Sequence, residues 1–495
     1  MVIRKPIAAA AVVLVATSVA SCSGDSGSPT PAARIDYVAG AIEPILTRGE
    51  GFVIEGLGFG TARGTVLLTK INGGTIEAAV ADSAWTSFTI TAVVPDSAAT
   101  GTEALAVVTA AGTTILATVH VLPRSFFDPG TVTWTARAPY PGAVAGIGLT
   151  VAEFPEPGGV LRTTLYAAGG ADPPLMTPDS GVYVARATAG GAGAIDGWTR
   201  QHDTTAQARS RVLPAPRAFA AAAVATRYNS RFPGTALYVI GGIDRSGAAQ
   251  ASVFAADVTA DSVIGRFVFL EPLPAPRAGA IGVVRHGRIY VIGGTDQLGQ
   301  PQSSVYMGRI GANGHIDGWY LQPSLVGPRA YGAGLARDIR VIAIGGVADS
   351  VPPGGGVGTG TQRLVTGDTA AVSLLSGFFT GAWGAGPALL PEGRSQFALL
   401  DLDSTVLIVG GIYGGAGSNS AETLAAAVND DSLSAFAGPV GTNRIADLMC
   451  LTEPAGTLIG PTGVAWHEAD GTHRGLVVGG ADLATQGRRS CAWGF

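Results

Sequence analysis

Charged residues are scarce in this chain of 495 residues. Asp, Glu, Lys and Arg together make up 14% of it, and the two lysines are Lys5 and Lys70. A formal charge of −5 without any basic cluster argues against nucleic acid as a partner. No second long apolar segment follows the one at the N-terminus, which argues against further membrane spans. The 73 glycines instead favour a folded chain of strands and turns.

Several catalytic patterns are missing as well. The sequence has no sialidase Asp-box, no GxSxG elbow and no phosphate-binding loop. His467 and His473 flank an expected turn at residues 469–471 and could hold a metal together, but no obvious third ligand or Cys/Asp cluster accompanies them. We therefore predict no catalytic residue, no metal and no cofactor, and leave enzymatic activity open. The other histidines are scattered: His120, His202, His286 and His315.

The N-terminus has the composition of a secretory signal. Two basic residues precede an apolar stretch at residues 7–19, which is too short to span a bilayer as a mature helix. Residues 19–22, Val-Ala-Ser-Cys, resemble the lipobox of bacterial lipoproteins, which implies that Cys22 is lipidated and becomes the new N-terminus. An ordinary signal cut near Ala20 is the alternative. Ser23 stands where the family pattern has an aspartate for inner-membrane retention, so the resemblance implies the outer membrane.

Residues 1–22 are thus predicted to be a lipoprotein signal and residues 23–33, rich in Ser, Gly, Pro and Ala, a flexible tether. Loss of Arg4 and Lys5 with the signal changes the formal charge from −5 to −7. The length of the remaining chain and a compositional break near Pro123 predict two folded domains.

Residues 34–123 show period-2 apolar alternation, broken by Gly and Pro at a spacing of roughly 10 residues, which is typical of a β-sandwich. Landmarks at residues 42–44 and 56–60 resemble those of the immunoglobulin-like IPT/TIG domain, which implies a spacer or interaction module. We interpret Trp85 as a core aromatic, with a contact residue on an exposed edge as the alternative. His120 is interpreted as an outward-facing strand residue.

Six Gly-Gly pairs recur across the rest of the chain, each ending a short β-branched or apolar run. Gly241, Gly293 and Gly345 follow one another at intervals of 52 residues, a length that suits one four-stranded sheet per repeat. We predict that these glycines permit backbone conformations and close packing that a side chain would block. The pairs are Gly169 and Gly170, Gly241 and Gly242, Gly293 and Gly294, Gly345 and Gly346, Gly410 and Gly411, and Gly479 and Gly480.

The diglycine, the apolar strand after it and an aromatic in the fourth strand resemble the kelch repeat. The resemblance implies an all-β fold in which a six-bladed β-propeller, residues 130–495, follows the immunoglobulin-like sandwich. The fourth-strand aromatics number one fewer than the diglycines, and we predict that the strand around Trp134 completes the last blade and closes the ring. The five aromatics are Trp198, Phe267, Trp319, Trp383 and Phe436.

Two cysteines follow the signal. Cys450 lies in an insertion at residues 442–459, and Cys491 begins the third strand of the last repeat. In a propeller these two connections open on the same face of adjacent blades, and an oxidising envelope favours their pairing. We predict a Cys450–Cys491 disulfide, with two isolated buried thiols as the alternative.

An arginine opens the inner strand of four repeats, near one mouth of the channel that a propeller would have. Clustered guanidinium groups there are candidates for binding a carboxylate or a sulfate. Aspartates follow four of the diglycines on the same face, so a structural ring of salt bridges is the alternative. The arginines are Arg217, Arg277, Arg329 and Arg394, and the aspartates are Asp172, Asp244, Asp296 and Asp482.

We expect a monomeric, lipid-anchored envelope protein that binds a protein or glycan through the propeller face, including the long loops at residues 349–361 and 442–459, and that does not catalyse a reaction. A sugar-modifying enzyme resembling kelch-type mutarotases, with Arg277, Arg329 and Arg394 as its substrate clamp, is one alternative. A purely structural envelope protein is another. Kelch-type galactose oxidases bind copper through paired tyrosines and histidines, and this sequence has no Tyr-His pair.

Overall fold

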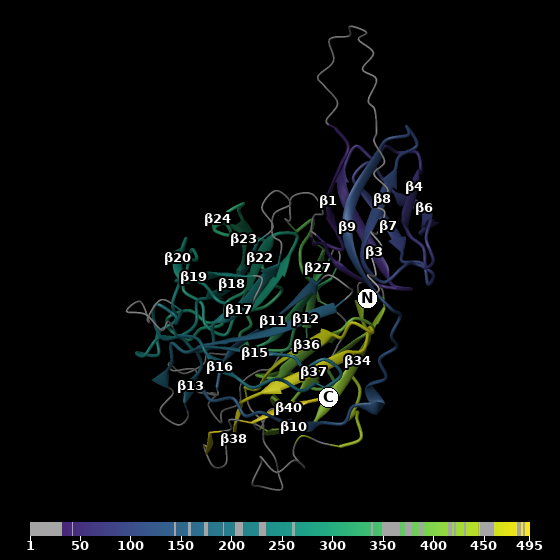
Figure 1. Ribbon diagram of the computed structural model, residues 1–495. Coiled ribbons are helices and arrows are strands. Elements are labelled where there is room, and N and C mark those ends of the chain that lie inside the picture. The colour runs from purple at the N-terminus through teal and green to yellow at the C-terminus, as the bar shows by residue number, and fades with distance from the viewer. Residues whose placement is uncertain are drawn as a thin grey trace, which may run out of the picture.

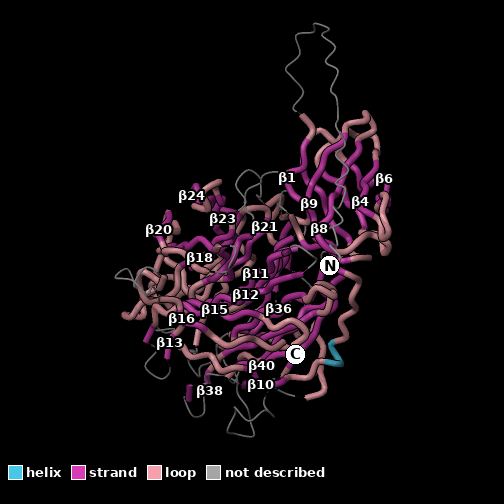
Figure 2. Tube along the Cα trace, viewed as in Figure 1, coloured by secondary structure: helices cyan, strands magenta, loops and turns pink. Residues whose placement is uncertain are grey.

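The computed structural model describes residues 32–495 except for 42, 143–144, 157–159, 173–176, 192, 203–210, 227–233, 260–262, 338–339, 349–366, 372–378, 386–389, 414–417, 420–421, 430–431, 444, 446–459, 483–486 and 489–490. Cys22, Cys450 and the loop at residues 349–361 therefore lie outside the described residues. Within the described part the chain is built of strands, and its one helix is the single-turn η1 (Pro129–Thr131) (Figure 2). The predicted all-β class is confirmed. None of the described helices is long and apolar enough to cross a membrane.

The smaller body, in purple and blue in Figure 1, consists of two sheets that share one apolar core. Its strands pair antiparallel except for β2 and β9, which are parallel. The first sheet contains β1 (Arg34–Val38), β3 (Gly51–Leu57), β7 (Thr89–Val93) and β6 (Ala79–Trp85) in that order. The second contains β2 (Ile45–Thr47), β9 (Thr114–Leu122), β8 (Gly101–Val108), β4 (Thr65–Thr69) and β5 (Thr75–Glu77).

Two residues of this body were singled out from the sequence. Trp85 is 5% exposed and donates from Nε1 to the carbonyl of Gly60 at 3.2 Å, so it is a core aromatic as expected. The expectation that His120 faces outward is wrong, because its side chain is only 2% exposed. This end of β9 lies close enough to Glu153 of the larger body for the two side chains to interact electrostatically.

The larger body contains six four-stranded antiparallel sheets, numbered here from one to six along the chain. Sheet one is β11 (Gly148–Glu156), β12 (Val160–Ala168), β15 (Val182–Arg186) and β16 (Thr199–Arg200); sheet two is β17 (Ala221–Thr226), β18 (Thr235–Ile240), β19 (Val253–Val258) and β20 (Val268–Leu270). Sheet three is β21 (Ile281–Arg285), β22 (Arg288–Ile292), β23 (Val305–Ile310) and β24 (Ile316–Gln322); sheet four is β25 (Ala333–Arg337), β26 (Arg340–Ile344), β27 (Gly367–Ala371) and β28 (Gly384–Ala385).

Sheet five is β30 (Ala398–Leu402), β31 (Thr405–Val409), β34 (Thr423–Asn429) and β35 (Ser432–Leu433); sheet six is β36 (Thr462–His467), β37 (His473–Val478), β40 (Ala492–Gly494) and β10 (Thr135–Arg137). Short strands in the connections complete the set: β13 (Ala171–Asp172) with β14 (Thr177–Pro178), β29 (Arg394–Ser395) with β32 (Ile412–Tyr413) and β33 (Ser418–Asn419), and β38 (Ala481–Asp482) with β39 (Gly487–Arg488).

The first strand of each sheet contacts the first strand of the next. The contacts run through β11, β17, β21, β25, β30 and β36, and β36 in turn contacts β11. Apolar clusters fill the space between neighbouring sheets, and each of the larger clusters draws buried residues from two of them. This packing brings the starts of all six first strands together at one end. We call the other end of these strands the hairpin end.

The diglycines connect consecutive sheets. At Gly293 and Gly294 the second amide donates to the carbonyl of Arg329 in the following sheet at 2.8 Å. The first glycine has a φ of +63°, and a Cβ there would clash with that same carbonyl. The same bond joins Gly170 to Arg217, Gly242 to Arg277 and Gly346 to Arg394. These glycines are therefore needed where one sheet meets the next.

Sheet six is assembled from both ends of the larger body. β10, which comes before sheet one in the chain, pairs with β40 at its end, with Ala136 opposite Trp493. The strand begins one residue after Trp134, whose indole instead donates to Thr423 Oγ1 in sheet five at 2.9 Å. Asn443 bonds the backbone of Trp134 on both sides, at 2.7 and 2.8 Å.

The aromatics expected inside the fourth strands mostly flank them. Only Trp319 lies within its strand, β24, whereas Trp198, Phe267 and Trp383 come one residue before theirs. Phe436 lies three residues after β35. Most of the fourth strands are themselves only two or three residues long.

The two bodies meet at the turn between β21 and β22. His286 adopts a φ of +50° there, and its Nε2 contacts a carboxylate oxygen of Glu55. Both side chains are 1% exposed or less, and the ring of Tyr37 packs edge-on against the imidazole with centroids 5.6 Å apart. Burial and the charges of Arg285 and Arg288 lower the pKa of His286 to about 2.

Cys491 is disulfide-bonded. Its proposed partner, Cys450, lies outside the described residues.

Candidate functional site

The four arginines proposed as ligand-binding groups are buried, each between 3% and 5% exposed. Arg217 and Arg277 donate to the carbonyls of the preceding prolines at 2.7 and 2.6 Å and to the hydroxyls of Ser252 and Ser304. Arg329 and Arg394 donate to the carbonyls of Gly345 and Gly410, both at 2.9 Å. These guanidinium groups are thus bonded to the protein's own backbone and hydroxyls.

Two of the aspartates after the diglycines, Asp244 and Asp296, organise their own turns. Asp244 accepts from the amide and hydroxyl of Ser246 and from the Gln250 amide. Asp296 accepts from the backbone amides of Leu298 and Gln300 and, at 2.9 Å, from Gln302 Nε2. Asp244 also lies within electrostatic reach of Arg217. These contacts favour a structural role for the arginines, made by hydrogen bonds to carbonyls and hydroxyls where the sequence suggested salt bridges to the aspartates.

A pocket of about 140 Å³ marks the point where the six first strands begin. The residue two positions before each of these strands has a left-handed φ between +53° and +64°. Their backbones form a chain of hydrogen bonds from sheet to sheet, with N–H to O distances of 2.7–2.9 Å. In order they are Gly146, Phe219, Gly279, Tyr331, Gln396 and Gly460, and the amide of each residue after Gly146 donates to the carbonyl of the one named before it.

Large and small side chains alternate along most of these six hydrogen-bonded residues. The rings of Phe219 and Tyr331 meet edge-on, with centroids 5.4 Å apart, across Gly279, where a Cβ would strike the Tyr331 ring. Burial raises the pKa of Tyr331 to about 12, so the phenol stays neutral. Aromatic rings therefore occupy the place where the sequence predicted cationic groups.

A different set of polar side chains converges at the opposite, hairpin end. Asp403 occupies the turn between β30 and β31 with a φ of +57°, a conformation that aspartate tolerates better than most residues. His467 and His473 are register partners across the turn between β36 and β37, so both imidazoles lie on one face of the hairpin. The contact between β30 and β36 brings Asp403 to that face.

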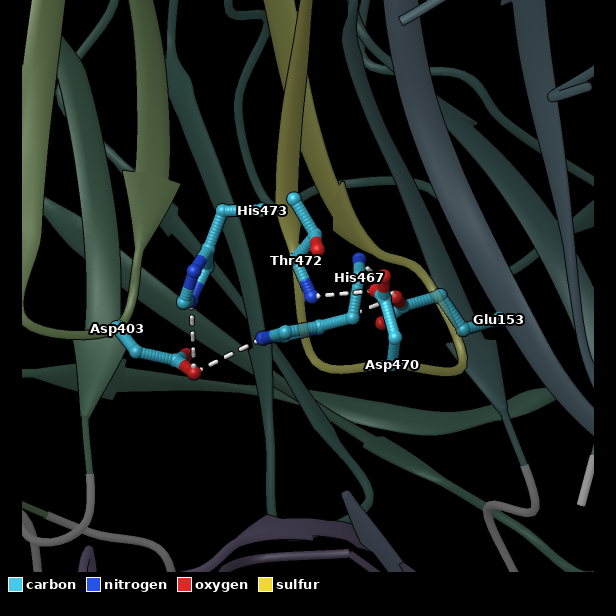
Figure 3. Close-up of polar contacts among 6 residues, drawn as sticks. All are labelled: Glu153, Asp403, His467, Asp470, Thr472 and His473. Atoms are coloured by element: carbon cyan, nitrogen blue, oxygen red, sulfur yellow. Dashed lines mark hydrogen bonds and ion pairs between the residues drawn. The ribbon is translucent and has the colours of Figure 1, made fainter. Parts of the chain in front are cut away.

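Figure 3 shows the resulting arrangement. Asp403 Oδ2 lies 2.8 Å from His467 Nε2 and 3.3 Å from His473 Nε2, and these three ligand atoms all fall within 4.8 Å of one another. Glu153 on β11 accepts from the backbone N–H of His467 at 2.6 Å and from its Nδ1 at 3.1 Å. We call Asp403, His467, His473 and Glu153 the hairpin cluster.

The charges of the hairpin cluster depend on one another. Burial disfavours an imidazolium, but the carboxylates of Glu153 and Asp403 outweigh it and raise the pKa of His467 well above its usual value. Burial likewise opposes ionisation of Asp403, yet the two histidines lower its pKa far below the normal range. An imidazolium between two carboxylates is therefore the stable state of the metal-free cluster.

A cavity of about 360 Å³ adjoins His473 where the connection between the two bodies meets β10 and β37. Arg137 and Arg474 line it, and burial together with the charge of Arg474 lowers the pKa of Arg137. Arg137 donates to the carbonyls of Gly193 and Gly494 at 3.1 and 3.4 Å, and Arg474 Nε donates to Glu468 at 2.8 Å. Phe126, which is 87% exposed, and several hydroxyl side chains complete the wall. The hydroxyl residues are Ser125, Thr131, Thr133, Thr135 and Thr472.

Sequence reasoning found only part of these sites. It named His467 and His473 and the turn at residues 469–471, but it did not connect them with Asp403 or Glu153. Those two residues lie in other sheets, and the only local signal was an aspartate in a tight turn. Arg137 was missed because it belongs to no repeated position.

No protein-family model matches the chain, and no curated protein is detectably similar to it.

Proposed function

We propose that this chain is a bacterial envelope lipoprotein, anchored through Cys22, in which a six-bladed kelch-like propeller follows an immunoglobulin-like sandwich and binds an acidic glycan without catalysis. The six four-stranded sheets and the cyclic contacts of their first strands support the propeller. The lipobox resemblance supports the anchor and the outer membrane. The monomeric state rests on the sequence alone.

The observation that carries the binding function is the cavity of about 360 Å³ at the hairpin end. Its volume suits a small ligand or the end of a larger one. Arg474 bonds Glu468 through Nε alone, which leaves its Nη donors for a carboxylate or sulfate group. Hydroxyls can bond sugar hydroxyls, and an exposed ring offers a stacking face. Asp128 also lines the cavity, but its carboxylate accepts from the amide of Gly130 at 2.8 Å. The cavity thus presents guanidinium, hydroxyl and aromatic groups together, which suits an acidic sugar.

The contacts of the channel-mouth arginines weigh against the mutarotase-like alternative. Its proposed clamp is Arg277, Arg329 and Arg394, and these side chains are buried and bonded to carbonyls and hydroxyls inside the fold. The site of recognition is therefore proposed at the hairpin end instead of at the channel mouth.

The test is binding of residues 28–495 to an array of neutral and acidic glycans. Phe126→Ala removes an exposed ring from the cavity and should reduce binding at least about tenfold without changing stability. Phe269→Ala is the matched control, because this ring is also largely exposed, at 67%, but does not line the cavity. No binding by the parent protein, or equal losses in the two variants, would reject the glycan site and direct the search to a protein partner by crosslinking.

The proposed ring closure has its own test. Removal of residues 493–495 deletes Trp493, which is fully buried between β10 and β37, and Phe495, whose ring packs against Trp134. We expect a large drop in the thermal unfolding midpoint. An unchanged midpoint would contradict closure through β40.

A further inference from the structure

We propose that Asp403, His467 and His473 bind one divalent first-row metal ion of the zinc class. The three side chains offer two imidazole nitrogens and one carboxylate oxygen, a donor set found in zinc sites that keep a position open for water. The sequence alone offered two histidines and no third ligand, and the fold supplies the third from a neighbouring sheet.

The geometry of the three ligand atoms is close to that of a bound ion. Zinc–nitrogen and zinc–oxygen bonds of about 2 Å place neighbouring ligand atoms on the order of 3.3 Å apart. Asp403 Oδ2 lies 2.8 and 3.3 Å from the two Nε2 atoms. The ligand nitrogens of the two histidines lie within 4.8 Å of each other, so adjustments of side-chain torsions would place an ion between the three atoms.

Glu153 supplies the support that such sites need. A metal-ligating histidine usually donates its other ring N–H to a carboxylate, which fixes the ring's tautomer and orientation. His467 has that arrangement already, with Nδ1 facing Glu153 and Nε2 facing Asp403. Binding of the ion at Nε2 displaces the proton held there to solvent, and the Nδ1–H bond to Glu153 is kept.

The site is accessible from one side. The Asp403 side chain is 37% exposed, whereas His467 is 16% and His473 3% exposed. An ion can thus enter past Asp403 and complete its coordination with water. The ring of Phe127, from the connection between the two bodies, packs against His473 with centroids 5.9 Å apart. A bound ion would therefore tie sheets five and six together beside that connection.

The test is equilibrium dialysis of Zn²⁺ against the full chain, purified in detergent without a polyhistidine tag, with Mg²⁺ as the comparison ion. We expect one Zn²⁺ per chain and no comparable uptake of Mg²⁺. Asp403→Asn keeps the shape of a partly exposed side chain and should weaken Zn²⁺ binding by about 100-fold or more, and Glu153→Gln by about tenfold. His315→Gln, at an exposed histidine in the β23–β24 turn, is the matched control and should bind as the parent does.

Thermal unfolding gives a second readout that does not depend on dialysis. Saturating Zn²⁺ should raise the midpoint of the parent chain and of His315→Gln, but not that of Asp403→Asn. Absence of Zn²⁺ uptake by the parent chain, or equal uptake by the parent and Asp403→Asn, would overturn the metal site. Neither result depends on a glycan, so the metal site and the proposed binding function fail separately.

Discussion

The two ends of the six first strands use polar residues in opposite ways. Where the strands begin, arginines recur from sheet to sheet, and each is buried and bonded to carbonyl or hydroxyl oxygens of its own surroundings. At the hairpin end the polar residues occur once each, and they contact one another across sheets or across the two bodies. Polar residues that recur from sheet to sheet therefore stabilise the sheets, whereas polar residues that occur once are the better candidates for a binding site.

The largest effect should come from breaking the contact between the bodies at the hairpin end. His286→Ala removes a buried ring that packs on Tyr37 and leaves the Glu55 side chain buried without this polar contact, which we expect to cost about 3–5 kcal/mol of the free energy of unfolding. Urea unfolding of the parent and variant chains measures this loss. Because an apolar pair buries no polar group and refills the space, Glu55→Leu with His286→Leu should recover most of the stability. A double variant no more stable than His286→Ala would show that the lost polar contact and the cavity are not the cause.

A smaller effect is expected from a repeated glycine. Gly293→Ala places a Cβ against the Arg329 carbonyl at a φ of +63° and should cost about 3 kcal/mol, from both backbone strain and the clash. Gly190→Ala is the matched control, since Gly190 has a φ of +68° but no atom within 4 Å of the added carbon. It should cost about 1 kcal/mol in the same unfolding measurement. Equal losses of stability in the two variants would mean that the clash with the Arg329 carbonyl adds nothing to the cost of backbone strain.

The smallest effect concerns His120, near the contact with Glu153. Burial lowers the pKa of this imidazole, although Glu153 partly opposes the shift. The folded chain therefore leaves His120 neutral where the unfolded chain takes up a proton, so stability falls as the pH drops below about 6.5, by at most ~1.4 kcal/mol per unit. Comparison of the parent with His120→Gln by urea unfolding at about pH 7 and about pH 5 isolates this contribution. A difference between the chains that does not change with pH would exclude it.

The sequence predicted where the strands lie better than which strands pair with one another. Apolar runs ending in Gly-Gly correctly placed the second strands, such as β18, β22 and β31, because alternation and glycine are local signals. The short strands β5 and β16 have no such pattern, since only a few residues of each pair with the adjoining strand. The all-β class could therefore be predicted, whereas the short pairings follow from contacts that the sequence does not encode locally.

The candidate sites were predicted less completely, for a related reason. His467 and His473 are close in sequence and face each other in a hairpin, so their proximity could be foreseen. Asp403 joins them only because β30 packs on β36. The arginines were correctly identified as repeated, but their burial depends on which carbonyls and hydroxyls surround them. His120 was misjudged because its position in a strand says nothing about the body packed against it.

The double attachment of Trp134 has a mechanical consequence. This residue lies where the connection from the smaller body enters the larger one, with its backbone bonded to Asn443 and its indole to Thr423. The next three residues pair with the end of the chain in β40. Tension applied to the smaller body along this connection is therefore divided between sheets five and six. The hydrogen bonds between β10 and β40, which join the two ends of the larger body, bear part of that force.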